Sequence, residues 1–152
     1  MTPVPQPAAT PVEPSWPPAD PSVVLACTLW MEARNQGSRG LQAVANVIVN
    51  RANHPSWWGS DIRGVCLASE QFSSWNEGST QVPLVKQAIA SGDSVYNTAV
   101  EAAKLAVAGT LPDITMTSDS YYALSMHTPP KWATPERFTV QIGTQRFYRV
   151  QI

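Results

Sequence analysis

Two consecutive helical stretches, residues 22–34 and 38–52, constrain the fold more than any other feature of this chain. The first is an apolar run that Ser22 precedes as an N-cap and that ends near Gly37. The second has polar Asn46 and Asn50 on one side and an apolar stripe at helical spacing on the other: Leu41, Val44, Ala45 and Ile48. We therefore expect the second helix to pack against the first.

Shorter helices are expected in the middle of the chain. Ser60 or Asp61 is placed to cap a short helix that runs through Leu67. Two further helices are predicted at about residues 81–90 and 94–108, closed by Gly92 and Gly109.

The pattern changes after Pro112. Residues 138–142 and 146–150 predict a β-hairpin that turns around Gly143 and Thr144, and residues 121–124 predict a third short strand. The fold class expected is α+β, mostly helical, with a small antiparallel β element near the C-terminus. No repeat of 20 to 50 residues is found, which argues against a solenoid.

Residues 1–21 hold eight of the 14 prolines in the chain. Such a segment cannot sustain helix or sheet hydrogen bonding, so we expect a flexible proline-rich tail or linker. Trp16, which lies within this segment, can still dock on the domain. The 152-residue length suits one folded domain, expected at residues 22–152.

Composition and charge exclude several classes of function. The net charge is −1 and charged residues make up 14% of the chain, so the basic field that favours nucleic acid is missing. No export signal is recognisable and no segment has the roughly 20 apolar residues of a membrane span, so stable membrane insertion is not expected. Motifs for metal or nucleotide chemistry are missing, so no cofactor is expected, and the lack of heptads favours a monomer.

The two cysteines leave two alternatives open. Cys27 lies in the apolar helical run, which favours a buried thiol. A disulfide between Cys27 and Cys66 in an oxidising compartment is the alternative.

Glu32 is the strongest catalytic candidate. At about 100° per residue, Leu25, Leu29 and Glu32 fall within roughly 60° on the first helix, so the carboxylate points with apolar side chains. Such surroundings raise a carboxyl pKa toward the range in which it can protonate a glycosidic oxygen. The alternative is a structural ion pair from Glu32 to Arg34 or Arg51.

Two further clusters are candidates for substrate binding. The run at residues 69–75 combines aromatic and polar groups suited to sugars, and Glu70 is the natural second carboxylate. The second cluster is expected to line the opposite wall of a cleft. The candidates are Glu70, Gln71, Phe72, Ser73 and Trp75 from the first cluster, and Tyr121, Tyr122 and His127 from the second. Alternatively, Phe72 and Trp75 plug the core and His127 is a surface residue.

Several segments in order resemble the SleB family of cell wall hydrolases, which includes spore cortex-lytic enzymes and phage endolysins. They are Trp30–Arg34, Gly37, Gly40–Arg51, the QFSxW segment Gln71–Trp75, Trp132–Ala133 and Ile142–Arg149. Two positions depart from the family: many relatives have a histidine where this chain has Gln145, and His127 alone remains of a histidine-rich turn.

The resemblance implies a lysozyme-like helical core with a small sheet, and it identifies Glu32 as the catalytic acid. It also implies that the domain at residues 22–152 cleaves peptidoglycan glycan strands between N-acetylmuramic acid and N-acetylglucosamine, by lytic transglycosylation. A phage endolysin is the expected origin, made in the host cytoplasm and released to the cell wall or periplasm by a separate membrane-permeabilising protein. The alternatives are a hydrolytic muramidase, a non-catalytic peptidoglycan-binding or virion module, and a structural helical domain.

Overall fold

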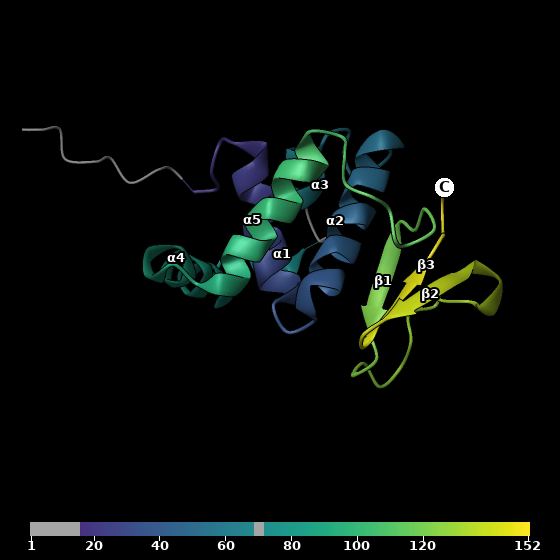
Figure 1. Ribbon diagram of the computed structural model, residues 1–152. Coiled ribbons are helices and arrows are strands. Elements are labelled where there is room, and N and C mark those ends of the chain that lie inside the picture. The colour runs from purple at the N-terminus through teal and green to yellow at the C-terminus, as the bar shows by residue number, and fades with distance from the viewer. Residues whose placement is uncertain (1–15, 69–71) are drawn as a thin grey trace, which may run out of the picture.

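Helices and a small sheet form two adjoining parts of the molecule in the computed structural model, which describes residues 16–68 and 72–152. The helices are α1 (Pro21–Ala33), α2 (Gly37–Asn53), α3 (Ile62–Leu67), α4 (Gln81–Ser91) and α5 (Ser94–Val107), with 3₁₀ turns η1 (Ser73–Trp75) and η2 (Pro135–Arg137). Strands β1 (Ser120–Ala123), β2 (Phe138–Ile142) and β3 (Gln145–Tyr148) pair antiparallel in the order β1-β3-β2. Figure 1 shows α2 between the other helices and the sheet. The predicted α+β class is confirmed.

Helix α1 lies at the centre of the helical part, against α2, α3, α4, α5 and η1. Residues 24–31 are all buried, so this helix has no solvated face. Its N-cap is Asp20, whose Oδ1 accepts the Ser22 backbone N–H at 2.9 Å, so the prediction of Ser22 as the cap is wrong. Proline lacks an N–H and suits the first helical position, so the helix begins at Pro21 and the residue before it becomes the cap.

Residues that precede the predicted start of the domain at residue 22 also contact it. Trp16 packs against the core with its ring centroid 6.2 Å from that of Trp75, and Arg63 Nε donates to the Pro18 carbonyl at 3.0 Å. The rest of the predicted proline-rich tail, residues 1–15, lies outside the described residues.

Helix α2 joins the two parts because it is buried on opposite faces. The predicted stripe is confirmed, since all four of its residues belong to the helical core. On the other face, Ala43 and Val47 form a second cluster with Ile142 and Phe147 of the sheet. The helix therefore fixes where the sheet stands relative to α1.

Two asparagines of α2 also hold the segment that leads into β1. Asn46 donates to the Pro112 carbonyl at 2.9 Å and accepts the Ile114 N–H at 3.0 Å. Asn50 donates to the Ser118 carbonyl at 2.9 Å. Buried amides need such partners, so these bonds set the entry to β1.

The shorter helices follow their sequence signals. Asp61 caps α3 by accepting the Gly64 N–H at 2.6 Å, and Gly92 closes α4 with φ of 70°. Gly109, with φ of 76°, follows the end of α5. Among the described residues, no helix is long and apolar enough to cross a bilayer.

Both cysteines are buried and free, as the thiol alternative predicted. Burial raises the pKa of the Cys27 thiol to about 11 and that of the Cys66 thiol to about 12. Both side chains are therefore protonated at neutral pH and pack as small apolar groups.

The hairpin between β2 and β3 docks on the turn that follows α1. Gly143 has φ of 59°, and a Cβ there would lie 2.9 Å from Gln36 Oε1. The same oxygen accepts the Thr144 N–H at 3.2 Å. The left-handed backbone favours glycine at this position, and a side chain there would have to displace the Gln36 amide.

Strand β3 ends at Tyr148 rather than at the predicted Val150, because the chain after it bonds to Asp119. The Asp119 carboxylate is fully buried and accepts backbone N–H groups from Val150 at 2.8 Å, Gln151 at 2.7 Å and Ile152 at 3.1 Å. One side chain thus anchors the C-terminal residues beside β1.

Replacement of Asp119 by alanine should destabilise the fold by about 2–4 kcal/mol, because it leaves these N–H groups without their acceptor. Urea unfolding followed by circular dichroism would measure the change. Glu101→Ala is the matched control, because Glu101 is exposed and its 4.0 Å contact with Lys104 is worth less than about 1 kcal/mol. Equal effects of the two substitutions would contradict the anchoring role of Asp119.

Candidate active site

Glu32 lies in the last turn of α1, half-buried, and η1 holds its carboxylate in place. Ser74 Oγ donates to Glu32 Oε1 at 3.0 Å. The next residue, Trp75, donates from Nε1 to Thr28 Oγ1 at 2.8 Å. Thr28 and Glu32 are one helical turn apart, so η1 is tied to the same side of α1 at two points.

Burial raises the pKa of the Glu32 carboxyl above its usual range, while hydrogen bonds from the Ser74 side chain and backbone oppose the rise. Burial has this effect because it disfavours the charged form. The carboxyl is therefore suited to hold a proton at a higher pH than an exposed glutamate.

The structural alternative for Glu32, an ion pair with Arg34 or Arg51, is not found. The ion pair within residues 16–68 and 72–152 is Lys104–Glu101. Arg34 instead donates to Gln81 Oε1 at 2.7 Å and to the Met31 carbonyl at 3.2 Å, and lies 4.4 Å from the centroid of the Trp30 ring. The guanidinium of Arg34 thus joins the end of α1 to the start of α4.

A cavity of about 610 Å³ opens between α1, α2 and the start of the sheet. Its lining combines one carboxyl, one guanidinium, hydroxyls and aromatic rings: Glu32, Arg51, Phe72, Ser73, Tyr121, Tyr122, Ala123, Met126 and Pro130. Aromatic faces with polar groups beside them suit the alternating apolar and hydroxylated surfaces of a sugar.

A second, more polar cavity of about 250 Å³ lies at the end of α1. Its lining comes from α1, the turn after it, η1 and α4: Met31, Glu32, Ala33, Arg34, Asn35, Gln36, Ser74 and Gln81. Glu32 is the residue that lines both cavities in the described part of the chain. A polymer bound across both would therefore pass over the Glu32 carboxyl.

The tyrosines of β1 form the wall opposite Glu32. Burial and the nearby Glu32 carboxylate raise the pKa of Tyr121 above its usual value, so its phenol keeps its proton. Tyr122 stacks on Tyr148 with ring centroids 5.8 Å apart and meets the edge of Trp132 at 6.4 Å. This wall is held rigid by aromatic contacts and presents hydroxyls able to donate hydrogen bonds.

The structure brings some of the predicted site residues together and separates others. Five of them line the larger cavity: Glu32, Phe72, Ser73, Tyr121 and Tyr122. Trp75 turns its Nε1 toward α1 and lines a different cavity, and exposed His127 does not line the larger one, although Met126 beside it does. Glu70 and Gln71 lie outside the described residues.

Sequence reasoning missed Ser74 and Arg51 as site residues. Ser74 lies within the 69–75 run, but only the fold shows that it, rather than Ser73, faces Glu32. Arg51 was considered only as an ion-pair partner, yet it lines the larger cavity, donates to the Asp119 carbonyl at 2.7 Å and lies 5.6 Å from the Phe72 ring centroid.

Gln145, at a position where the resemblance led us to expect a histidine, is buried on β3. Its Oε1 has no hydrogen-bond partner among the described residues. A buried acceptor without a donor costs free energy. No group of three His, Cys, Asp or Glu side chains that could hold a metal occurs within the described ranges.

A family model described as "Cell Wall Hydrolase" matches residues 35–148, about three quarters of the chain. This chain belongs to the cell wall hydrolase family. It is thus an enzyme that acts on peptidoglycan. The matched segment begins just after Glu32, so the match covers η1 and the β1 wall but does not itself assign the carboxyl.

Two solved structures are similar to this cell wall hydrolase. The catalytic domain of the germination-specific lytic transglycosylase SleB from Bacillus anthracis superposes with a TM-score of 0.61 at 24% identity, over 90% of this chain and 99% of that one. The catalytic domain of SleB from Bacillus cereus gives a TM-score of 0.61 at 25% identity, over 85% and 89%. No curated protein matches the sequence. The SleB-type resemblance is confirmed.

Replacement of Glu32 by glutamine should stabilise the hydrolase more at pH 7 than at pH 4. Because the folded-state pKa of Glu32 is raised, deprotonation costs the folded state more than the unfolded state, so wild-type stability falls as pH rises through this window. Glutamine removes that cost and keeps an oxygen that can accept from Ser74.

Urea unfolding of wild type and Glu32→Gln at both pH values would measure the difference. Glu101→Gln is the control, since it makes the same change at an exposed carboxyl on α5, away from the core. A stabilising effect of Glu32→Gln that shrinks between pH 4 and pH 7 would mean that the folded state lowers the pKa of Glu32 instead of raising it.

Proposed function

We propose that this enzyme cleaves the glycan strand between N-acetylmuramic acid and N-acetylglucosamine by lytic transglycosylation, with Glu32 as the acid and then the base. The observation that carries the proposal is the position of Glu32 at the junction of two cavities, with burial raising its pKa. A strand that fills both cavities has one glycosidic bond over this carboxyl, where a proton donor is needed.

The first step is a proton transfer. The protonated Glu32 carboxyl donates to the glycosidic oxygen, the bond to C1 of the muramic acid residue breaks, and the N-acetylglucosamine residue leaves with a free 4-hydroxyl. Positive charge then develops at C1. Glu32 is left as a carboxylate that Ser74 Oγ stabilises from 3.0 Å.

The second step closes a ring within the substrate. The 6-hydroxyl of the muramic acid residue attacks C1 and gives its proton to the Glu32 carboxylate, which forms a 1,6-anhydro product and restores the enzyme. Internal attack has effective molarities of about 10⁵–10⁸ M, so no second enzymatic carboxylate is needed. Glu32 is the carboxylate that lines either cavity within the described residues, and Glu70 lies outside them.

The larger cavity is suited to bind the strand during both steps. Tyr121 keeps its phenolic proton, so its hydroxyl can donate a hydrogen bond to a sugar hydroxyl. The rings of Phe72 and Tyr122 offer apolar faces for pyranose C–H groups.

As part of the proposal, the enzyme is a phage endolysin whose strand cleavage lyses the host wall, because the family that the sequence resembles includes such proteins.

Product analysis tests the proposal. Purified peptidoglycan digested with wild type should release 1,6-anhydromuropeptides, identified by mass, and Glu32→Gln should lower their yield by at least about 100-fold, the usual size of a lost general acid. Glu101→Gln is the matched control, because Glu101 is exposed on α5 and lines neither active-site cavity; its yield should equal that of wild type.

Each other product pattern contradicts a defined part of the proposal. Reducing-end muramic acid in place of the anhydro form would mean that water is the acceptor and that the enzyme is a muramidase. Full activity in a folded Glu32→Gln variant would make Glu32 structural. A wild type that sediments with the wall and releases nothing would be a binding module.

A further inference from the structure

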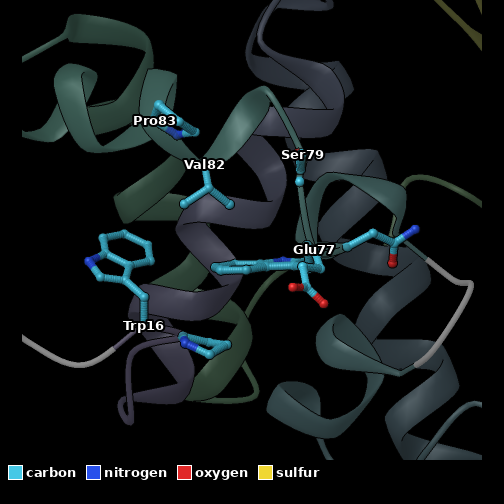
Figure 2. Close-up of a pocket in the computed structure, with 9 residues that line it drawn as sticks. Trp16, Glu77, Ser79, Val82 and Pro83 are labelled. Carbon is cyan, nitrogen blue, oxygen red and sulfur yellow. The ribbon is translucent and has the colours of Figure 1, made fainter.

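A third cavity, of about 340 Å³, lies beside η1 and the start of α4 and does not include Glu32. Figure 2 shows Trp16 on one side of it, Glu77 and Ser79 on the other, and Val82 and Pro83 along one edge. Trp75 completes the apolar lining. Neither the family match nor the proposed reaction gives this cavity a role.

The two indole rings are held in place without a ligand. Trp75 is fixed by its bond from Nε1 to Thr28 Oγ1, and the Trp16 ring lies against it at 6.2 Å with a 32° tilt. Lys86 Nζ lies 4.7 Å from the Trp16 ring centroid, although Lys86 does not line the cavity. Such prior ordering lowers the entropy cost of binding.

We infer that this cavity is a second carbohydrate site, which takes one N-acetylhexosamine residue of the glycan strand at a distance from Glu32. Indole faces and the Val82 and Pro83 side chains contact the C–H groups and acetamido methyl of such a residue. Glu77 and Ser79 offer oxygens for its hydroxyls at the cavity edge. The choice of sugar rests on the proposed function.

Charge favours the sugar over the other component of peptidoglycan, its acidic stem peptide. The charged side chain that lines the cavity is the exposed Glu77 carboxylate. A like charge across a contact is unfavourable, so a peptide with free carboxylates is disfavoured at this cavity. A neutral N-acetylated sugar carries no such penalty.

The third cavity and the smaller active-site cavity are lined by residues that are close together in the chain. Trp75 follows Ser74, which bonds Glu32. On the other side, Ser79 Oγ accepts the Gln81 N–H at 3.1 Å, and Gln81 lines the smaller active-site cavity. The stretch of chain from η1 to the start of α4 therefore contributes to the lining of both cavities.

A titration of the full chain carrying Glu32→Gln, which prevents turnover, tests the inference. The probe is a soluble β-1,4-linked tetramer of N-acetylglucosamine, and the readout is the ¹H–¹⁵N signals of the backbone amides and of the tryptophan indoles. The Trp16 signal should shift on binding, and Trp16→Ala should weaken the binding that is seen at Trp75 about tenfold. Trp57→Ala, which changes an exposed tryptophan outside the cavity, is the control and should leave binding unchanged.

A second variant guards against a folding defect, because Trp16 also packs on the core. Glu77→Ala changes an exposed side chain and should weaken the same binding severalfold with the spectrum of the fold intact. Tetramer binding equal to that of the Glu32→Gln parent in both Trp16→Ala and Glu77→Ala would overturn the inference.

The outcomes separate this inference from the proposed function. If the tetramer shifts signals of Tyr121 and Tyr122 but not of Trp16, the third cavity is not a sugar site, while the proposed function is unaffected. If the Trp16 signal responds to an L-alanyl-D-glutamate peptide and not to the tetramer, the ligand class is wrong. If wild type releases no muropeptides but the tetramer still shifts Trp16, the proposed function fails and the sugar site stands.

Discussion

The burial of α1 on all sides is the constraint on which the rest of the structure depends. Helices α2, α3, α4 and α5 all pack against it, and η1 is tied to it through Thr28 and Glu32. Glu32 lies in the last turn of this helix and is partly buried by the same packing. The packing that stabilises the core therefore also raises the pKa of Glu32. The stability of the core and the chemistry of the site thus have the same origin.

Helix α2 determines where a cavity forms beside Glu32. Because it is buried on opposite faces, it sets the sheet at a fixed distance from α1 and leaves the larger cavity between Glu32 and the tyrosines of β1. Asn46, Asn50 and the Asp119 carboxylate then hold the chain on either side of β1. Membership of the cell wall hydrolase family agrees with this arrangement, since the matched residues contribute most of the lining of this cavity.

Local signals in the sequence predicted the fold well. The site residues that they did not predict are positioned by contacts between segments that are distant in the sequence. Asp61 and Gly92 act through neighbouring backbone groups, so their roles could be predicted from the sequence. The angular position of Glu32 also pointed to burial, but α1 is buried all round, so its angle alone did not identify it. Ser74 and Ser73 look alike in sequence, and only the docking of η1 on α1 decides which one bonds Glu32.

The pH dependence of glycan cleavage in wild type and Ser74→Ala tests the central claim most directly, namely that the proton on a buried Glu32 does the chemistry. The Ser74 hydrogen bond lowers the pKa of Glu32, so its removal should move the alkaline limb of kcat/KM to higher pH, because the acid stays protonated further. Ser73→Ala, a neighbouring change with no bond to Glu32, should leave the limb in place. An alkaline limb that does not move in Ser74→Ala, or that moves to lower pH, would contradict the account.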